Sequence, residues 1–383
     1  MHGLIIGGGI GGLTAAIALA RVGLKVTVFE RAPQLREVGT GLTLWSNAMQ
    51  VLRRLGVGAQ TRAAASVLRT CRIVTWEFRP ILDLPLEPFP IDSESPSLGI
   101  HRAELQRILS EAVGDNLRLG HACVAVRQEQ SRVIARFADG HEVSGDFLIG
   151  ADGLRSVVRS ELFHVEKPRY AGAAVWRGVS RLDHPKIEYD ATIVALGRGS
   201  QVGWLPIGGR WIYWFATANR PEGVIESRQH LKQRLLQRFC FWTSPIPELI
   251  DATPDEQILM TDLYDRPPRW PWGQGRISLL GDAAHPMTPN LGQGACQAIE
   301  DAYVLAECFR KENDPVRALR VYEHHRYART AKLVRHSWRL GKILTLENRL
   351  ACHFRDQLLR WNQRRIARQT RAVIQFDVTQ GRP

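Results

Sequence analysis

Residues 3–30, GLIIGGGIGGLTAAIALARVGLKVTVFE, decide the fold of this chain. The apolar run at 4–6 is typical of a buried parallel strand, and the run at 26–29 predicts a second one. Alanines and leucines recur at helical spacing between them. Gly7, Gly9 and Gly12 give the spacing G-x-G-x-x-G, and the second strand ends in Glu30, about 20 residues later. The stretch therefore predicts a strand–helix–strand unit that binds an adenine dinucleotide.

Each of these residues has a physical role in such a unit. Gly7 permits the tight turn, Gly9 lets a diphosphate approach the backbone, and Gly12 lets the helix pack closely on the strand. The diphosphate lies at the positive end of the helix, and Glu30 accepts hydrogen bonds from a ribose diol. A buried apolar hairpin and a targeting segment are the alternatives. Five glycines in residues 7–12 would interrupt the apolar core of a targeting segment, so we reject that reading.

Composition sets the broad class of the protein. With 383 residues the chain is long for one core, so one large domain or two interlocked domains are expected. Hydrophobic content of 44% and charged content of 23% are ordinary for a soluble globular protein. The chain contains no apolar run of roughly 18 residues or more, so no membrane span is predicted. The six cysteines lack CxxC or zinc-like spacing, which predicts reduced thiols in a cytoplasmic enzyme, without a metal site or disulfide framework.

The formal net charge of +13 is concentrated late in the chain. Residues 346–376 hold seven arginines against Glu347 and Asp356. Such an excess suits nucleic acid, an anionic membrane surface or anionic substrates. No nucleic-acid module is recognisable, so no nucleic-acid partner is expected. A solvated helix face is the favoured interpretation, and contact with a membrane surface is the minor alternative.

The rest of the chain predicts a nucleotide-binding unit assembled from separate stretches. Gly39 and Gly41 indicate a loop, and 67–99 reads as strand-like pieces broken by prolines. The further predicted elements are helices at 47–55, 100–114, 226–243 and 294–312, strands across 117–149, antiparallel strands across 168–219, a strand at 276–280, and helices from 318 onward. The predicted domains are 1–70 with 100–165 and 272–330, then 71–99 with 166–271, and a helical segment 331–383.

Two further motifs make the prediction sharper. The first is GADGLRS at 150–156, and the second is GDAAHPMTPNLGQG at 281–294, completed by EDA at 300–302. Together with residues 3–30 they resemble, in order and spacing, the three signatures of the class A flavoprotein monooxygenases. This family of aromatic hydroxylases includes salicylate and 3-hydroxybenzoate hydroxylase, and the resemblance covers roughly residues 3–330. It implies an α/β fold, with a Rossmann-like FAD-binding domain of the glutathione-reductase type, an inserted, mostly antiparallel β-sheet substrate domain and a helical C-terminus.

The resemblance also implies the residues that bind FAD. Asp282 would bond the ribityl or ribose part, and Arg102 would contact the diphosphate region. Gly292 and Gly294 would begin a helix whose N–H groups face the N1–C2=O edge of the flavin, which becomes anionic on reduction. The implied cofactor-binding set is Gly7, Gly9, Gly11, Gly12, Glu30, Arg31, Thr43, Arg102, Val124, Asp152, Asp282, Pro289, Gly292, Gln293, Gly294, Ala295 and Cys296.

Two titratable residues in these motifs have more than one reading. Asp152 has a dual structural and NAD(P)H-related role in the family, and its purely structural alternative is a turn acid that holds Arg155 or Arg159. His285 could be a catalytic base or a metal ligand, but its place in the flavin loop favours a hydrogen-bonded structural histidine. The chain has no second dinucleotide fingerprint, so NAD(P)H is expected to bind transiently as co-substrate, and NADH and NADPH are not distinguished.

The reaction implied is NAD(P)H- and O₂-dependent hydroxylation of a small electron-rich aromatic or heteroaromatic substrate through a flavin C4a-hydroperoxide. Salicylate-type enzymes carry a histidine base on the strand that matches 208–220, where this chain has Tyr213. That pattern is closer to the FAD-dependent urate hydroxylases, although Gln201, with Arg198 nearby, replaces their arginine. Arg177 would hold a carboxylate or phenolate, or else be a surface arginine. The predicted catalytic residues are Tyr213, Arg177 and Gln293.

Two other functions stay open. One is an epoxidase or hydroxylase of a larger polyene or quinolone, and the other is an FAD-binding protein without turnover. The expected partners are the substrate, O₂ and NAD(P)H, in a monomer or homodimer.

Overall fold

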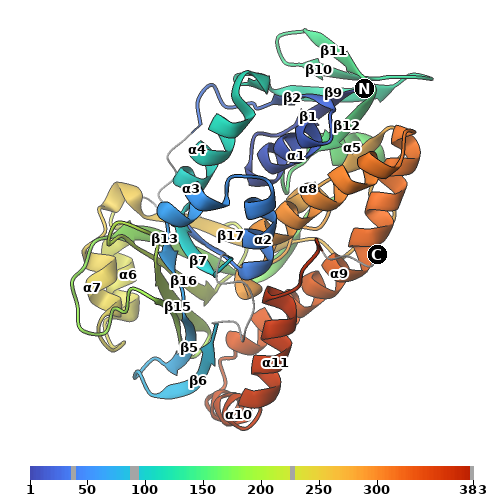
Figure 1. The fold of residues 1–383 in the computed structure, drawn as a ribbon. Coiled ribbons are helices and arrows are strands. Elements are labelled where there is room, and N and C mark those ends of the chain that lie inside the picture. Colours follow the sequence, from blue (N-terminus) through green and yellow to red (C-terminus); the bar gives the residue numbers. More distant parts are fainter. Residues whose placement is uncertain (36–39, 87–94, 225–228, 380–383) are drawn as a thin grey trace.

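The computed structural model describes residues 1–35, 40–86, 95–224 and 229–379, and Figure 1 shows how its elements are arranged. A five-stranded parallel sheet forms the nucleotide-binding half, in the order β18-β12-β1-β2-β8. These strands are β18 (Ile277–Leu279), β12 (Phe147–Gly150), β1 (His2–Ile6), β2 (Lys25–Phe29) and β8 (Leu117–Arg118). All four residues of β12 are buried, as expected for a parallel strand that is covered on both faces.

Helices and a small antiparallel sheet cover this parallel sheet. Helix α1 (Ile10–Arg21) packs against α8 (Gly294–Lys311) and α4 (Arg102–Val113). The small sheet contains β9 (Cys123–Gln128), β10 (Val133–Phe137) and β11 (Glu142–Gly145), with α5 (Val157–Phe163) against β9. Phe29 and Phe137 are in ring contact at 4.7 Å, so β2 and β10 share one core.

A seven-stranded sheet forms the other half, in the order β17-β13-β16-β15-β14-β5-β6. Its strands are β17 (Leu259–Asp265), β13 (Arg169–Ser180), β16 (Ile212–Asn219), β15 (Ser200–Pro206), β14 (Ala191–Leu196), β5 (Thr70–Thr75) and β6 (Pro80–Pro85). All neighbours are antiparallel except β14 and β5. Side chains alternate between its faces, so Trp214 lies in the core beneath α6 (Leu231–Phe239) and α7 (Ile246–Asp251), whereas Tyr213 joins the core of the nucleotide half.

A three-stranded sheet lies between the two halves. It consists of β3 (Gly41–Leu44), β7 (Leu98–His101) and β4 (Ser66–Val67). The helices α2 (Ser46–Arg54) and α3 (Gly58–Ala63) lie between β3 and β4 in the sequence. A Cβ atom on Gly41 would stand 2.5 Å from the Cβ atom of Tyr213, so β3 lies directly on the large sheet. The prediction that Gly41 belongs to a loop is therefore wrong, because its pairing with His101 places it in a strand. Gly39 lies outside the described residues.

Three helices complete the chain: α9 (Pro315–Leu344), α10 (Arg349–Trp361) and α11 (Gln363–Ile374). Near the start of α9 the Tyr322 hydroxyl donates to the Leu279 carbonyl at 3.1 Å, and near its end Lys342 Nζ donates to the Ala171 carbonyl at 2.8 Å. The predicted domain limit at 330/331 falls inside this continuous helix, and the other limits stay predictions. Across the described ranges, no helix is long and apolar enough to cross a membrane.

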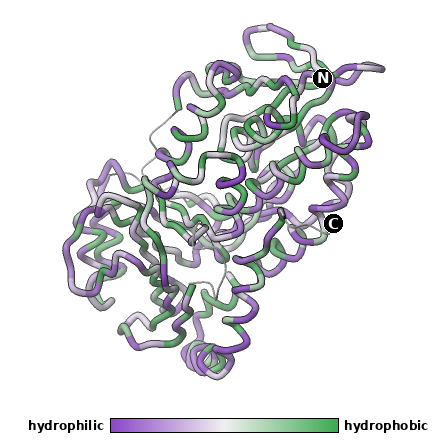
Figure 2. Tube along the Cα trace, in the orientation of Figure 1, coloured by the Kyte–Doolittle hydropathy of each residue, from purple (hydrophilic) through white to green (hydrophobic). Residues whose placement is uncertain are grey.

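The structure thus confirms the α/β class, with a parallel sheet, a mostly antiparallel second sheet and C-terminal helices. Figure 2 shows apolar residues along the sheets and the inward sides of the helices, as two adjoining cores require.

Candidate active site

The glycine-rich turn between β1 and α1 is tightly packed at two positions and open at a third. Gly7 has φ +112°, and a Cβ atom there would lie 2.4 Å from the Ala151 carbonyl oxygen. A Cβ atom on Gly12 would lie 1.9 Å from the carbonyl oxygen of Gly7. By contrast, no heavy atom lies within 4 Å of a Cβ atom on Gly9. The turn thus has the close packing predicted for Gly7 and Gly12, and free space beside Gly9.

The first turn of α1 presents backbone N–H groups that the described part of the chain does not cap. Gly9 is the N-cap residue, no side chain caps the helix there, and no acidic residue occupies the first turn. Such a helix end attracts an anion through its N–H groups and its dipole.

Glu30 lies beside this turn, at the end of β2. Its carboxylate accepts hydrogen bonds from the backbone N–H of Gly8 at 2.7 Å and of Ala32 at 2.9 Å. Gln106 on α4 donates to the Gly8 carbonyl at 2.9 Å, and Arg31 is exposed. Glu30 therefore holds the turn and the strand end together, and the ribose-binding role predicted for it stays a prediction.

A second cluster forms where β18 meets α8. Asp282 follows β18 in a one-turn 3₁₀ helix, and its Oδ1 lies 3.9 Å from the place of a Cβ atom on Gly294. The Asp282 side chain is exposed, yet shielding by the surrounding protein raises its pKa, against the opposing influence of His285 and Arg102. Asp282 and Gly294, predicted cofactor residues from two separate motif positions, thus come together here, and Arg102 is near enough to oppose the rise in the pKa of Asp282.

Gln293 is the N-cap residue of α8 and is buried. Its Oε1 accepts from Asn47 Nδ2 at 3.2 Å and from Gln297 Nε2 at 2.9 Å. Its Nε2 has no hydrogen-bond partner in the described part of the chain. A buried donor without a partner is costly, so this amide suits an acceptor on a bound group. The catalytic role predicted for Gln293 stays a prediction.

A buried ionic network holds the start of the loop at 281–294, which we call the flavin loop. Asp301 accepts from the Gly281 N–H at 3.0 Å, from His285 Nε2 at 2.6 Å and from Arg326 Nε at 2.6 Å, and Arg326 also bonds Glu300 at 2.7 Å. Burial alone would raise the pKa of Asp301, but His285 and Arg326 lower it to about 2. His285 is thus buried and hydrogen-bonded as predicted, and its structural role stays the favoured interpretation.

Sequence reasoning missed several members of this network, among them Asn47 and Arg326. Asn47 Nδ2 donates to Glu300 Oε1 at 2.6 Å. Arg326 lies within the basic run of α9, where arginines are expected at the surface. The only signal for a buried cation was the adjacent pair Glu300–Asp301 on a helix that must pack inward.

Asp152 follows β12 and caps a helix. Its carboxylate accepts from the N–H groups of Val157 at 2.7 Å and Val158 at 3.2 Å, at the start of α5. The structural alternative thus takes another form than predicted: in the described residues Asp152 caps the helix and pairs with neither Arg155 nor Arg159, and Arg159 donates to the carbonyls of residues 283 and 284 at 3.1 and 3.2 Å. The NAD(P)H-related role of Asp152 stays a prediction.

Three more predicted cofactor residues lie around these clusters. Val124 is exposed on β9, and Pro289 is exposed in the loop before α8. The Cys296 thiol is buried against β3, since it lies 3.7 Å from the Thr43 carbonyl and accepts from the Trp45 N–H at 3.4 Å. Burial raises the pKa of Cys296 to about 12, so it packs as a neutral thiol.

The seven-stranded sheet, called the large sheet below, supplies the surface of the site that faces the nucleotide-binding half. Arg177 on β13 lies opposite Phe215 on β16, and Tyr213 lies two positions earlier on the same face. Burial raises the pKa of Tyr213 and the neighbouring Arg177 opposes the rise, so the phenol stays protonated at neutral pH and can donate a hydrogen bond. Arg177 is half-buried against this phenol, which argues against the surface alternative.

Gln201 links this sheet to the flavin loop. It is buried, and its Nε2 donates to Asn290 Oδ1 at 3.4 Å, while Asn290 donates to the Ser337 carbonyl at 3.1 Å. Arg198 does not replace the missing arginine, because it is exposed and donates to the Glu347 carbonyl at 3.1 Å.

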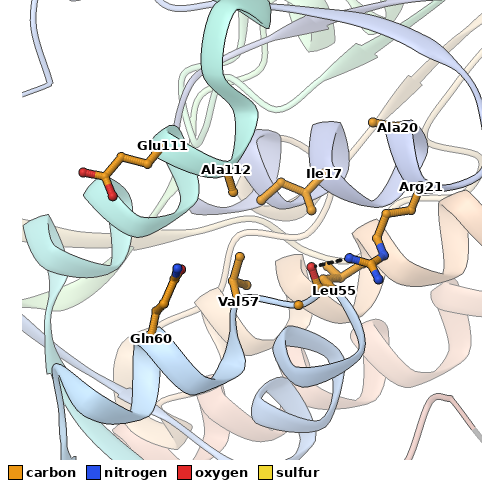
Figure 3. Close-up of a pocket in the computed structure, with 9 residues that line it drawn as sticks. Ile17, Ala20, Arg21, Leu55, Val57, Gln60, Glu111 and Ala112 are labelled. Carbon is orange, nitrogen blue, oxygen red and sulfur yellow. Dashed lines mark hydrogen bonds between the residues drawn. The ribbon is translucent and has the colours of Figure 1, made fainter.

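A separate pocket of about 500 Å³ lies elsewhere in the nucleotide half (Figure 3). It is lined by the C-terminal part of α1, by residues 55–57 and Gln60, and by Glu111 and Ala112 of α4. It contains none of the predicted site residues, and we do not assign it to the reaction.

These observations agree on one kind of ligand. Two helix N-termini without side-chain caps, the open space at Gly9 and the buried Gln293 amide donor fit the two phosphates and the ring of FAD. Glu30 and Asp282 supply the carboxylates that a ribose and a ribityl chain require.

Comparison with known proteins gives the same result. Residues 1–337 match the family described as FAD binding domain. Aurachin C monooxygenase/isomerase of Stigmatella aurantiaca is 44% identical over 375 residues, which cover 97% of each chain. FAD-dependent urate hydroxylase of Klebsiella pneumoniae is 34% identical over 339 residues, covering 87% of this chain and 88% of that one. The crystal structure of Klebsiella pneumoniae HpxO with FAD and uric acid superposes with a TM-score of 0.92 at 31% identity, covering 98% and 97% of the two chains.

Proposed function

This chain belongs to the FAD-binding monooxygenase family and is an FAD-dependent monooxygenase, and we propose that its substrate is a quinolone-type heteroaromatic compound. The observation that carries the proposal is the 44% identity with aurachin C monooxygenase/isomerase over 97% of both chains. This substrate is electron-rich, as predicted from the sequence, but it belongs to the larger class that was the alternative to small aromatic acids.

The substrate face supports a neutral ring system. Gln201 stands where the urate hydroxylase pattern has an arginine, and its amide is engaged by Asn290. Phe215 is half-buried beside Tyr213, with ring centroids 6.2 Å apart. An aromatic face that also carries Arg177 suits a planar heteroaromatic whose oxygen substituent gains negative charge.

Each residue of this face has a proposed task. When bound and reduced by NAD(P)H, FAD would activate O₂. The Tyr213 phenol donates a hydrogen bond to the oxygen substituent of the substrate, and Arg177 orients the phenol and favours developing negative charge. The packed sheet and the 288–294 loop exclude water.

The test measures coupled turnover. The FAD-loaded enzyme is given NADH or NADPH with a 4-hydroxyquinoline, its N-oxide, urate or salicylate, and NAD(P)H oxidation, peroxide release and ¹⁸O₂ incorporation are recorded. We expect a quinolone to accelerate oxidation, suppress peroxide and gain one labelled oxygen. Coupled turnover of urate or salicylate instead, or quinolone-stimulated oxidation with one peroxide per NAD(P)H, would reject the proposal.

A matched pair of variants links the result to the site. Arg177→Met removes the cation beside Tyr213, and we expect lower coupling with the quinolone. Arg317→Met removes an exposed arginine from the start of α9, and it should leave coupling unchanged.

A further inference from the structure

Helix α10 carries a stripe of large apolar side chains that face solvent. Four of its residues form this apolar stripe, and their exposed fractions are 68% for Leu350, 68% for Phe354, 59% for Leu358 and 81% for Trp361. Their spacing of four, four and three residues places them on one side of the helix. A contiguous exposed apolar surface of this kind indicates a contact with something other than water.

The packing of α10 fixes this stripe outward. On the opposite side Cys352 and Arg355 are buried, and Arg355 donates to the carbonyls of Gly197 at 3.3 Å and Leu344 at 3.0 Å. In Figure 1 the helix lies at the lower edge of the molecule, next to α11. The helix cannot turn its apolar side inward without losing these buried bonds.

The following helix adds positive charge beside the stripe. Arg364, Arg365 and Arg368 are exposed on α11, directly after Trp361, and within the described residues no carboxylate pairs with them. The two acids between 346 and 376 are engaged, since Asp356 pairs with Arg355 at 2.8 Å and Glu347 accepts from Asn219 at 2.8 Å. The surface therefore combines exposed aromatic and aliphatic groups with unneutralised arginines.

We propose that the apolar stripe of α10 and the arginines of α11 bind the surface of an anionic lipid bilayer. The apolar side chains enter the headgroup boundary, and the arginines attract anionic headgroups. A second copy of the chain fits poorly, because two equally basic surfaces would repel each other. This inference is independent of the substrate proposed above.

The experiment uses flotation of the full-length, FAD-loaded protein with phosphatidylcholine vesicles, with or without phosphatidylglycerol. Flavin absorbance reports where the protein migrates. We expect flotation with the anionic vesicles only, and its loss at high salt. The variant Phe354→Ser with Trp361→Ser should weaken binding at least about tenfold. Replacing Arg364, Arg365 and Arg368 by Gln should weaken it about fivefold per charge.

Two controls match these variants. Phe241→Ser changes an aromatic residue that is 84% exposed and lies far from α10 in sequence. Replacing Arg132, Arg136 and Arg317 by Gln removes three exposed charges elsewhere. Both controls should float like the wild type, and retained FAD shows that each variant is folded. Absence of flotation, or equal loss in the controls, would overturn the proposal. Concentration-dependent dimers that Phe354→Ser abolishes, without vesicle binding, would assign the stripe to a second copy and also overturn it.

Discussion

Replacing Gly9 by alanine should separate the folding role of the glycine turn from its ligand role. The residue has φ −77° and ψ −179°, which alanine adopts without strain, and no protein atom lies within 4 Å of the added Cβ atom. The free energy of unfolding of the FAD-free protein should therefore change by less than about 1 kcal/mol, in the stabilising direction, because alanine restricts the unfolded chain.

The cost of this methyl group should appear in FAD affinity. If the diphosphate lies against the backbone at Gly9, the Cβ atom displaces it and weakens about one charge-assisted hydrogen bond, worth about 1.5–3 kcal/mol. The dissociation constant of FAD should rise about 10- to 150-fold. Flavin fluorescence quenching during titration of FAD-free protein measures the constant, and urea denaturation of the same samples measures stability.

Gly12→Ala provides the contrast. There the Cβ atom would meet the Gly7 carbonyl oxygen at 1.9 Å, so the helix must move away from the strand, and stability should fall by about 1–3 kcal/mol even without FAD. Wild-type FAD affinity in Gly9→Ala would refute the placement of the diphosphate. A loss of stability in the FAD-free Gly9→Ala protein would show that the space beside Gly9 is not free for a methyl group.

Three further predictions concern buried or site residues. Arg326→Met removes a buried cation that bonds Glu300 and Asp301 and leaves Arg329 and His285 as their remaining partners, so urea denaturation should show a loss of about 3–5 kcal/mol. Exposed Arg317→Met should change little. Burial raises the pKa of Glu323 from 4.5 to about 7, although the hydrogen bond from Ser278 and the ion pair with Arg320 at 2.7 Å oppose the rise, so between these pH values the folded protein holds a proton that the unfolded chain has released. Stability should therefore fall by up to about 3 kcal/mol as pH rises from 4.5 to 7, and Glu323→Gln should lack this slope; equal slopes would contradict the assignment. Tyr213→Phe should lower kcat with the coupled substrate about tenfold without moving the pH profile near neutrality, because the phenol is already protonated. A shifted profile would instead indicate a titrating phenol.

The parts of the fold that the sequence predicted well are those coded by neighbouring residues. The strand–helix–strand unit at 3–30 needs only local periodicity and glycine spacing, and it appears as β1, α1 and β2. The strand-end acid Glu30 follows from the same local pattern, because a ligand at the carboxyl edge of a parallel sheet needs acceptors there, whereas the role of Asp282 came from the family resemblance.

What the sequence did not reveal depends on packing between distant segments. Gly41 pairs with His101 across sixty positions, so its strand is invisible from local glycine content. Arg326 reads as a surface arginine until α9 packs on α8 and buries it. The apolar stripe of α10 has an ordinary amphipathic sequence, and only the packing of its polar side decides that the apolar side faces outward.

The 30-residue helix α9 has a mechanical consequence. At about 1.5 Å per residue it is about 45 Å long, and it is bonded to the parallel sheet at one end, to the flavin loop through Ser337, and to the large sheet at the other end. Such a rod resists bending, so a hinge motion between the two halves would have to break the helix or its hydrogen bonds to the sheets. Access for ligands then calls for displacement of short loops rather than of whole halves, which favours fast, small-amplitude gating over slow closure of domains.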